Sequence, residues 1–313
     1  MQSPCFTLNH PMPPPWLVCP HIPYGHYNWD TGFAQPYLLA FSDWLDSLPA
    51  DQQKVYQDCF PAPKQWSHFY QQFMQYADDI AEIDDRYYEN DQHSVFFWEE
   101  EGKPKYDVQW LINHSQNNNN FVLFWGNKPP AGGGVNKSCL SQWWLSDFAL
   151  DSVSYCCMEQ YMMAEKACLF GDNESEERIL CTQDQAKIKA LGREVKNFDS
   201  AAWDQVKSSI VLNGNYLKFS QNEQLRHFLL HTEGCILVEA SPEDWVWGIG
   251  FSEQDANATV PPKWLGENRL GFALMEVRDE ITRVYRAYYQ IDWDEIRRIY
   301  PFYASYIKDI EIF

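Results

Sequence analysis

The stretch from Tyr155 to Phe170 constrains the fold of this chain more than any other segment. It contains neither proline nor glycine, and strong helix formers occupy most of its positions. Gly171 follows, and glycine readily adopts the left-handed conformation that ends many helices. The sequence therefore predicts a helix over residues 155–170 that stops at Gly171.

Two ionisable residues, Glu159 and Lys166, lie inside this predicted helix. Their spacing corresponds to about two helical turns, so both face one side, and the lysine side chain leans back toward the glutamate. Beside methionine and aromatic residues, such groups can have shifted pKa values, which acid–base or Schiff-base chemistry uses. The alternative is an ordinary amphipathic helix whose charged side chains face water.

Composition limits the classes of function that the chain can serve. Its 313 residues suit one large domain or two smaller ones, and a hydrophobic content of 45% indicates a folded protein. The formal net charge of -20 argues against an extended nucleic-acid groove, which needs clustered lysine and arginine. A small anionic ligand remains possible, because it needs only a local positive pocket.

Nothing in the sequence indicates a metal or a bound cofactor. The nine cysteines include no C-x-x-C pair, and His227 and His231 stand one turn apart without a third ligand. The start of the chain has no signal-peptide pattern, and no apolar run approaches the length of a membrane span. We therefore expect a cytoplasmic protein with reduced cysteines, no membrane contact and no cofactor; the oligomeric state stays open.

Changes in amino-acid composition and periodicity divide the chain into three expected parts. Residues 1–30 are rich in proline and aromatic residues and form either a packed arm or a tail, and helical periodicity follows over residues 36–76. Residues 78–91 are acidic, and the polar run at residues 116–120 is the best candidate boundary. We expect an acidic, aromatic-rich extension over residues 1–120, a catalytic domain over 121–290 and a C-terminal helix over 291–313.

Helices and a few strands alternate beyond that boundary. Residues 94–98, 121–125 and 235–240 have the β-branched and aromatic content of strands. Three consecutive glycines end the loop at residues 126–134 without the context of a phosphate-binding motif, which favours a flexible turn. Besides the stretch that ends at Gly171, helices are predicted over residues 174–181, 184–191, 200–211 (ending near Asn213 and Gly214), 223–230, 264–288 and 293–307.

Two further segments combine groups suited to ligand binding. Residues 140–148 place hydroxyl and amide groups beside two tryptophans, which suits a planar ring stacked on an indole; a tryptophan pair buried in the core is the alternative. Asp244 follows the predicted strand 235–240 in a turn with Trp247 and two glycines. Functional residues often occupy such loops, although Asp244 could equally be a turn residue.

A series of motifs resembles one known family. They are Leu-Ser-Gln-Trp-Trp (140–144), Tyr-x-x-x-Glu-Gln-Tyr-Met-Met-Ala-Glu-Lys-Ala (155–167), Leu-Phe-Gly-Asp (169–172), Lys-Ala-Leu-Gly-Arg-x-Val (189–195), Asn-x-x-Lys-Phe-Ser-Gln-Asn (215–222), Leu-Val-Glu-Ala-Ser-Pro-x-Asp-x-x-Trp-Gly-Ile-Gly (237–250) and Trp-x-Gly-x-Asn-x-Leu-Gly-x-Ala-Leu-Met-Glu-Val-Arg (264–278). Their order resembles the NADAR (NAD- and ADP-ribose-associated), or YbiA-like, family. The resemblance covers about residues 121–285 and leaves the first 120 residues unexplained.

The resemblance implies a helix-rich α+β fold, with a small β-sheet surrounded by helices, to which this chain adds a mainly helical N-terminal extension. It also implies an N-glycosidase that hydrolyses a ribosyl C1′–N bond. The substrates implied are ribosylamino-pyrimidine phosphates of riboflavin biosynthesis or ADP-ribose on guanine. Two alternatives are a non-catalytic module that binds ADP-ribose or NAD, and an antitoxin-like enzyme that reverses ADP-ribosylation of nucleic acid.

The family motifs, read with the chemistry above, give expected roles to individual residues. Glu159, Lys166 and Asp244 are the expected catalytic residues: Lys166 as nucleophile or phosphate-side cation, Glu159 as its proton partner, and Asp244 as acid, base or ribose anchor. Tryptophans would stack on the base, and arginine or lysine would hold phosphate oxygens unless they are plain surface charges. The expected substrate-binding residues are Trp125, Gly126, Ser141, Gln142, Trp144, Arg193, Lys218, Trp247 and Gly248.

This sequence departs from the family pattern at two loops. Asp151 and its neighbours stand where many members have a glycine, and residues 231–234 replace a tight Thr-Gly turn. Both departures leave the expected chemistry in place and put the choice of substrate in question.

Overall fold

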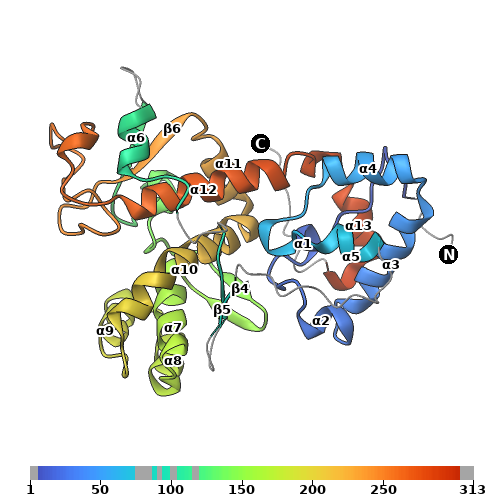
Figure 1. Cartoon of the computed structure of the whole chain (residues 1–313), viewed down its shortest axis with the longest axis horizontal. Helices are drawn as coiled ribbons and strands as arrows, with labels where there is room; N and C mark the ends of the chain where they lie inside the picture. The colour runs from blue at the N-terminus through green and yellow to red at the C-terminus, as the bar shows by residue number, and fades with distance from the viewer. Residues whose placement is uncertain (1–5, 75–86, 90–93, 99–103, 115–119, 304–313) are drawn as a thin grey trace. The chain divides into compact units, whose positions relative to one another are not determined.

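The computed structural model describes residues 6–74, 87–89, 94–98, 104–114 and 120–303 (Figure 1). Contacts divide the chain into two units: Met1–Glu82 with Leu150–Ser152 and Glu280–Phe313, and Ile83–Ala149 with Val153–Asp279. This division differs from the expected boundaries, because it groups residues 83–120 with the expected catalytic region and residues 280–290 with the N-terminal part. The polar run at 116–119 and most of the acidic segment at 78–91 lie outside the described residues.

The first unit is helical and has an aromatic core. Trp16 packs edge-on against Trp66 and Phe69, with ring centroids 5.5 and 5.3 Å apart. The hydroxyl of Tyr37 donates to the carbonyl of Pro13 at 2.7 Å. The proline-rich segment is therefore packed rather than a tail. The elements are α1 (Pro15–Val18), α2 (Tyr27–Asp30), α3 (Gln35–Ser47), α4 (Ala50–Cys59), η1 (Lys64–Trp66), α5 (Phe69–Met74), η4 (Tyr288–Gln290), α13 (Trp293–Ile299) and η5 (Pro301–Tyr303).

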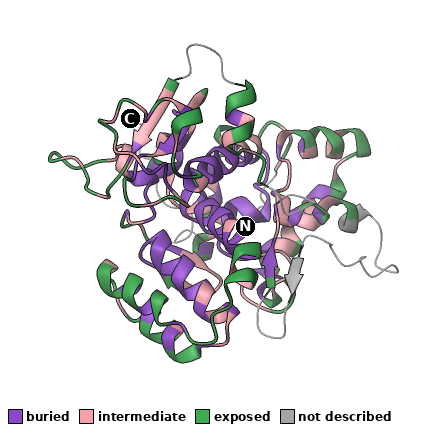
Figure 2. Ribbon diagram, turned by 60° about the vertical axis from the view of Figure 1, so that its left-hand side comes forward, coloured by how far each residue is buried: buried purple, intermediate pink, exposed green. Residues whose placement is uncertain are grey.

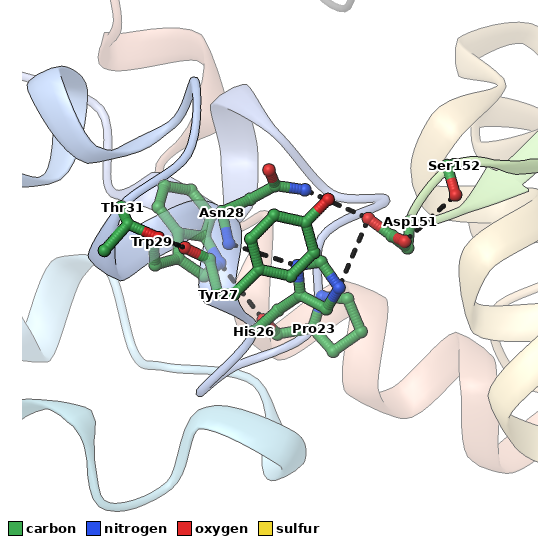
Figure 3. Close-up of polar contacts among 8 residues, drawn as sticks. All are labelled: Pro23, His26, Tyr27, Asn28, Trp29, Thr31, Asp151 and Ser152. Carbon is green, nitrogen blue, oxygen red and sulfur yellow. Dashed lines mark hydrogen bonds and ion pairs between the residues drawn. The ribbon is translucent and has the colours of Figure 1, made fainter.

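The turn at Asp151 belongs to the first unit and is held by polar contacts (Figure 3). Its carboxylate accepts a hydrogen bond from Asn28 Nδ2 at 3.0 Å and lies 3.4 Å from His26 Nε2. Its own N–H donates to the carbonyl of His21 at 2.7 Å. With φ at 51°, Asp151 takes the left-handed conformation that glycine adopts most easily, and aspartate tolerates it better than most residues.

Short strand pairs supply the sheet structure of the second unit. β3 (Asn120–Phe124) and β6 (Cys235–Glu239) pair in parallel, so their carboxyl ends, Phe124 and Glu239, lie side by side. The expected strands at 121–125 and 235–240 thus form one small sheet. A core cluster of Val238, Ile249 and Ala258 packs against it. Two antiparallel pairs complete the set: β1 (Tyr87–Glu89) with β2 (Ser94–Phe96), and β4 (Phe148–Leu150) with β5 (Val153–Tyr155).

Helices make up the rest of the second unit. They are α6 (Val108–His114), η2 (Lys137–Leu140), α7 (Met158–Leu169), α8 (Asn173–Leu180), α9 (Gln185–Arg193), α10 (Ser200–Gln221), α11 (Glu223–Leu230), η3 (Pro261–Lys263) and α12 (Arg269–Val284), whose last turn is grouped with the first unit. Of these, α8, α9 and α10 pack against α7. The arrangement confirms the expected helix-rich α+β class.

Helix α7 is the predicted helix, and it is buried on almost all sides by α8, α9 and α10. The burial can be followed in Figure 2, where buried residues are purple. A helix buried all round is a core helix, so the amphipathic alternative is wrong. The helix starts at Met158, because residues up to Tyr155 belong to β5, and Gly171 follows its end with φ at 65°.

Helix α10 runs through the expected stop at Asn213 and Gly214, which corrects that prediction. A Cβ on Gly214 would lie 2.4 Å from Cδ1 of Tyr161, so the glycine serves the close approach of α10 to α7. The Asn213 side chain accepts from Trp98 Nε1 at 2.8 Å and donates to the carbonyl of Phe96 at 3.0 Å. Both residues thus serve tertiary packing rather than helix termination.

Helix α12 begins at Arg269, later than the predicted start at residue 264. The preceding residues form a loop in which Asn268 is fully buried with φ at 52°. Its amide group bridges β6, accepting from the N–H of Glu239 and donating to the carbonyl of Leu237, both at 2.9 Å. Loop and sheet are therefore locked together. Among the described residues, no helix is long and apolar enough to cross a membrane, and no three metal-ligating side chains gather.

Candidate functional site

One cavity of about 220 Å³ in the second unit collects most of the chemically active side chains. Helices α7 and α9 supply one part of its wall, and the end of β6 with the loops at 142–143 and 244–247 supplies the rest. The lining residues are Gln142, Trp143, Glu159, Met162, Met163, Lys166, Lys189, Gly192, Arg193, Glu239, Asp244 and Trp247. The three expected catalytic residues thus line a single cavity.

Glu159 stands in the first turn of α7 and is 6% exposed. Its side chain accepts no hydrogen bond from the described residues, whereas its N–H donates to the carbonyl of Gln142 at 3.0 Å. Burial raises its pKa to about 7, with a further rise from Asp244 and an opposing effect of Lys189 and Arg193. Near neutral pH this carboxyl group can therefore both accept and donate a proton.

Lys166 lines the same cavity but turns away from Glu159. Its ammonium group donates to the carbonyl of Gly192 at 2.8 Å and lies 4.1 Å from the ring centroid of Phe198. The expected contact with Glu159 is thus replaced by a contact with α9. Burial lowers the pKa of Lys166, which increases the share of uncharged amine at a given pH.

Asp244 shapes a turn and also lines the cavity. One carboxylate oxygen accepts from the N–H groups of Val246 and Trp247, at 2.9 and 2.7 Å, so it shapes the turn. The same residue lines the cavity beside Trp247, which is half-buried. The turn therefore fixes an indole and a carboxylate in the cavity wall together.

Trp143, rather than the expected Trp144, faces the cavity. Lys189 Nζ lies 5.5 Å from its ring centroid, and Asn127 Nδ2 donates to its carbonyl at 3.0 Å. Gln185 of α9 donates to the same carbonyl. Trp144 is 8% exposed and outside the lining, because neighbouring residues of an irregular segment point in different directions.

Lys218 is another correction. It is fully buried, and its ammonium group donates to the carbonyls of Cys139 and Ser141 at 2.6 and 3.0 Å. Burial lowers its pKa to about 8. Lys218 therefore holds the loop that carries Gln142 and is not placed to bind a phosphate.

Four more expected binding residues lie outside the lining. Trp125 is 56% exposed, and Gly126 is an exposed turn residue with φ at 77°. Ser141 is buried behind the loop, and its hydroxyl accepts from the N–H of Trp143 at 3.1 Å. Gly248 lies beneath the turn, where a Cβ would come within 2.9 Å of the carbonyl of Glu239. Ser141 and Gly248 therefore lie behind the cavity wall, and Trp125 and Gly126 lie outside the cavity at the surface.

Comparison with known proteins identifies the family. The profile of the NADAR domain matches residues 123–282, about half of the chain. The chain belongs to the NADAR domain family. It is 45% identical to N-glycosidase R617 of Acanthamoeba polyphaga mimivirus over 166 residues, which are 51% of this chain and 95% of that protein.

Two bacterial relatives of this NADAR domain are more distant. N-glycosidase YbiA of Escherichia coli (strain K12) is 29% identical over 42% of this chain and 74% of its own length. Its NMR structure aligns with a TM-score of 0.43 at 25% identity, over 54% of this chain and 89% of that chain. Riboflavin biosynthesis protein VVA0006 of Vibrio vulnificus is 32% identical over 39% of this chain and 30% of its own length. The enzyme class expected from the sequence agrees with the name N-glycosidase.

Two charged residues of the NADAR cavity were missed in the sequence. Lys189 precedes the expected Arg193 by one helical turn on α9, and this spacing could have indicated a shared face. Glu239 ends an apolar strand, and a charged residue at such a position could have indicated a residue of the site. Burial raises the pKa of Glu239 to about 8, with smaller rises from Asp244 and Glu159.

Proposed function

We propose that this NADAR domain hydrolyses the bond between C1′ of a phosphorylated ribose and a nitrogen of the attached base. The observation that carries the proposal is the distribution of charge around one cavity. Glu159 is a buried carboxyl group, Glu239 is half-buried with one carboxyl oxygen enclosed, and Lys189 and Arg193 on α9 are exposed cations at the edge of the cavity. The cavity therefore offers carboxyl groups for a sugar and its base, and positive charge for a phosphate.

The chemistry of N-glycoside cleavage fits this arrangement. Breaking the C1′–N bond builds positive charge on the sugar, which a nearby carboxylate stabilises, and the same carboxylate can activate water. We assign that role to Glu159. Trp143 and Trp247 supply flat apolar surface in the lining, on which a base can stack.

The phosphate end of the substrate is assigned to α9. Arg193 offers a planar fork of donors suited to phosphate oxygens, and Lys189 adds a point charge. These two cations give the cavity a locally positive edge that can attract a phosphate. The net charge of -20 over the whole chain disfavours nonspecific contact with polyanions.

The size of the cavity restricts what it can enclose. Sites for drug-sized ligands measure about 300–1,000 Å³, so about 220 Å³ accommodates a nucleoside-sized group and leaves larger parts outside. Two substrates suggested by the family resemblance meet this limit: a ribosylamino-pyrimidine phosphate, and ADP-ribosylated guanine with the rest of the ligand outside the cavity. The riboflavin-related name of the Vibrio relative favours the first.

The test is direct incubation of the full chain with each substrate. We expect the free base to appear, identified by mass, from a ribosylamino-pyrimidine phosphate or from an ADP-ribosylated guanine oligonucleotide. The substrate that reacts faster at equal concentration identifies the class. Saturable binding with both ligands recovered unchanged would refute hydrolysis and leave the ligand-binding alternative.

Lys166 admits two roles in this reaction, as a nucleophile that opens the ribose to a Schiff base or as a binding group. Borohydride added during turnover separates them. A stable adduct on Lys166 assigns it the covalent role. If no adduct forms and Lys166→Met still lowers turnover, Lys166 acts in binding, and water attacks C1′ directly.

A further inference from the structure

Glu239 is held rigidly at the end of β6, with its side chain in the wall of the cavity. Its N–H donates to Asn268 Oδ1 at 2.9 Å, and its carbonyl accepts from the N–H of Ile249 at 3.0 Å. The parallel partner strand β3 pairs Phe124 with it. Backbone contacts on several sides therefore fix the main chain from which this side chain extends.

The carboxyl group itself has no role in holding the fold. Glu239 Oε2 is enclosed and has no hydrogen-bond partner among the described residues. Enclosing an unsatisfied polar group destabilises the folded state, so such a group in a cavity wall calls for an explanation outside the fold. A proton on the carboxyl group removes the charge and leaves a donor that can serve a ligand.

Glu239 belongs to the part of the cavity wall that the end of β6 forms, whereas Lys189 and Arg193 belong to α9. Lys189 and Arg193 both lower the pKa of Glu159, whereas of these two cations only Lys189 lowers that of Glu239. Asp244 is the strongest charged influence on Glu239. With the phosphate at α9, the proposed pose places the sugar near Glu159 of α7 and the base toward Glu239 at the end of β6.

We propose that Glu239 is the general acid of this site, donating its proton to the leaving nitrogen of the base. The inference rests on the proposed function. In both candidate substrate classes a nitrogen of the base is bonded to C1′, and the base leaves more readily as a neutral molecule than as an anion. Protonation by a positioned acid typically contributes about 10²–10⁴-fold to such a step.

The reaction balances with water as the only co-substrate. The C1′–N bond breaks, its electron pair goes to nitrogen, and nitrogen takes the proton of Glu239. The oxygen of a water molecule bonds to C1′, directly or by hydrolysis of an adduct on Lys166, and the proton that water loses passes to the carboxylate of Glu159. Exchange with solvent returns each group to its starting state, and the products are the free base and the free sugar phosphate.

Several charged groups face Glu239 and set the pH range in which it acts. They are Glu159 and Lys166 from α7, Lys189 and Arg193 from α9, and Asp244 from the loop after β6. Burial and the carboxylates raise the pKa of Glu239 to about 8, so the acid is protonated at neutral pH. Activity that depends on this proton falls as the pH rises through about 8.

Glu239→Gln tests the assignment, because it keeps the size of the side chain and removes the proton. We expect kcat to fall about 10²–10⁴-fold and the residual rate to lose the decline above about pH 8 that is expected of the native protein. Glu243→Gln is the matched control: Glu243 is exposed, lies four residues away and is outside the cavity, so its profile should equal that of the native chain.

Each remaining outcome is decisive. The assignment is wrong if Glu239→Gln keeps the native kcat, or if its activity still declines above about pH 8. In either case, turnover by the native protein still supports the N-glycosidase. No base released by the native chain from either substrate refutes the proposed function itself. If Glu239→Gln does not fold, Glu239→Asp replaces it. A lower kcat that still declines at high pH supports the proton-donor role, and an unaltered kcat contradicts it.

Discussion

At the scale of single residues, the proposed chemistry depends on Glu159. The side chain is buried at the start of α7, and burial is the main reason that its pKa rises to about 7. Replacing the carboxylate by an amide leaves shape and packing nearly unchanged and removes the ability to take a proton from water. Its contribution can therefore be separated from folding by one substitution.

We expect Glu159→Gln to lower kcat by about 10²–10⁴-fold, measured as base released by the full chain, while the melting temperature above pH 7 stays equal or rises. The rise follows because a buried group that ionises with a raised pKa destabilises the folded state at high pH. Full turnover in this variant would show that the reacting centre lies elsewhere.

Which tryptophan stacks on the base is also decided at the scale of single residues. Trp143 lines the cavity under Lys189, whereas Trp125 is exposed outside it. Stacking of a base on an aromatic side chain is worth about 1–3 kcal/mol. Trp143→Ala should therefore raise KM about 5–150-fold, and Trp125→Ala should leave it unchanged. Equal effects in steady-state assays would argue against base stacking at Trp143.

At the scale of elements, the site depends on how closely α9 approaches α7. A Cβ on Gly192 would lie 2.0 Å from Sδ of Met163, so any side chain there would require Met163 or the helix to move. The carbonyl of the same residue holds the ammonium group of Lys166 at 2.8 Å. One position therefore joins the packing of two helices to the placement of an expected catalytic side chain.

Gly192→Ala should push α9 away from α7. Overpacking of this kind typically costs about 1–3 kcal/mol, so we expect a lower free energy of unfolding in urea together with reduced turnover. Gly132→Ala is the matched control, because nothing lies within 4 Å of a Cβ at that exposed loop position. Native stability in Gly192→Ala would mean that Met163 moves aside freely.

At the scale of the whole molecule, the buried carboxyl groups couple stability to pH. The pKa values of Glu159 and Glu239 rise to about 7 and 8 in the folded protein, above their usual 4.5. The folded state therefore binds more protons than the unfolded state above about pH 4.5, and these groups make stability fall as the pH rises toward 8. His21, whose pKa burial lowers to about 4, has the opposite effect up to its usual 6.5.

Between about pH 6.5 and 8 His21 no longer opposes the carboxyl groups, and Lys218, whose pKa burial lowers to about 8, opposes them only toward the upper end. We therefore expect the melting temperature of the full chain to fall across this window. The double variant Glu159→Gln with Glu239→Gln should show a flatter profile, because neither group then binds a proton. A native melting temperature independent of pH from 6.5 to 8, measured by calorimetry, would contradict the burial of these charges.

Local sequence determined much of this protein. The helix-forming run 155–170 with Gly171 behind it specified α7, and the apolar runs near 121–125 and 235–240 specified the parallel strands, because these signals act between residues close in the chain. Motif order then indicated the NADAR family, and Glu159, Lys166 and Asp244 were expected and do line one cavity.

Only the tertiary structure decided which neighbouring side chain faces the cavity. It selected Trp143 over Trp144, committed Lys218 to backbone carbonyls, turned Lys166 toward Gly192 and brought Glu239 beside Glu159. Spacing along a chain fixes the face of a regular helix, but not the direction of residues in loops or the desolvation of a charge. Those depend on which distant segments pack together, and in this chain that packing decides which carboxyl group keeps its proton.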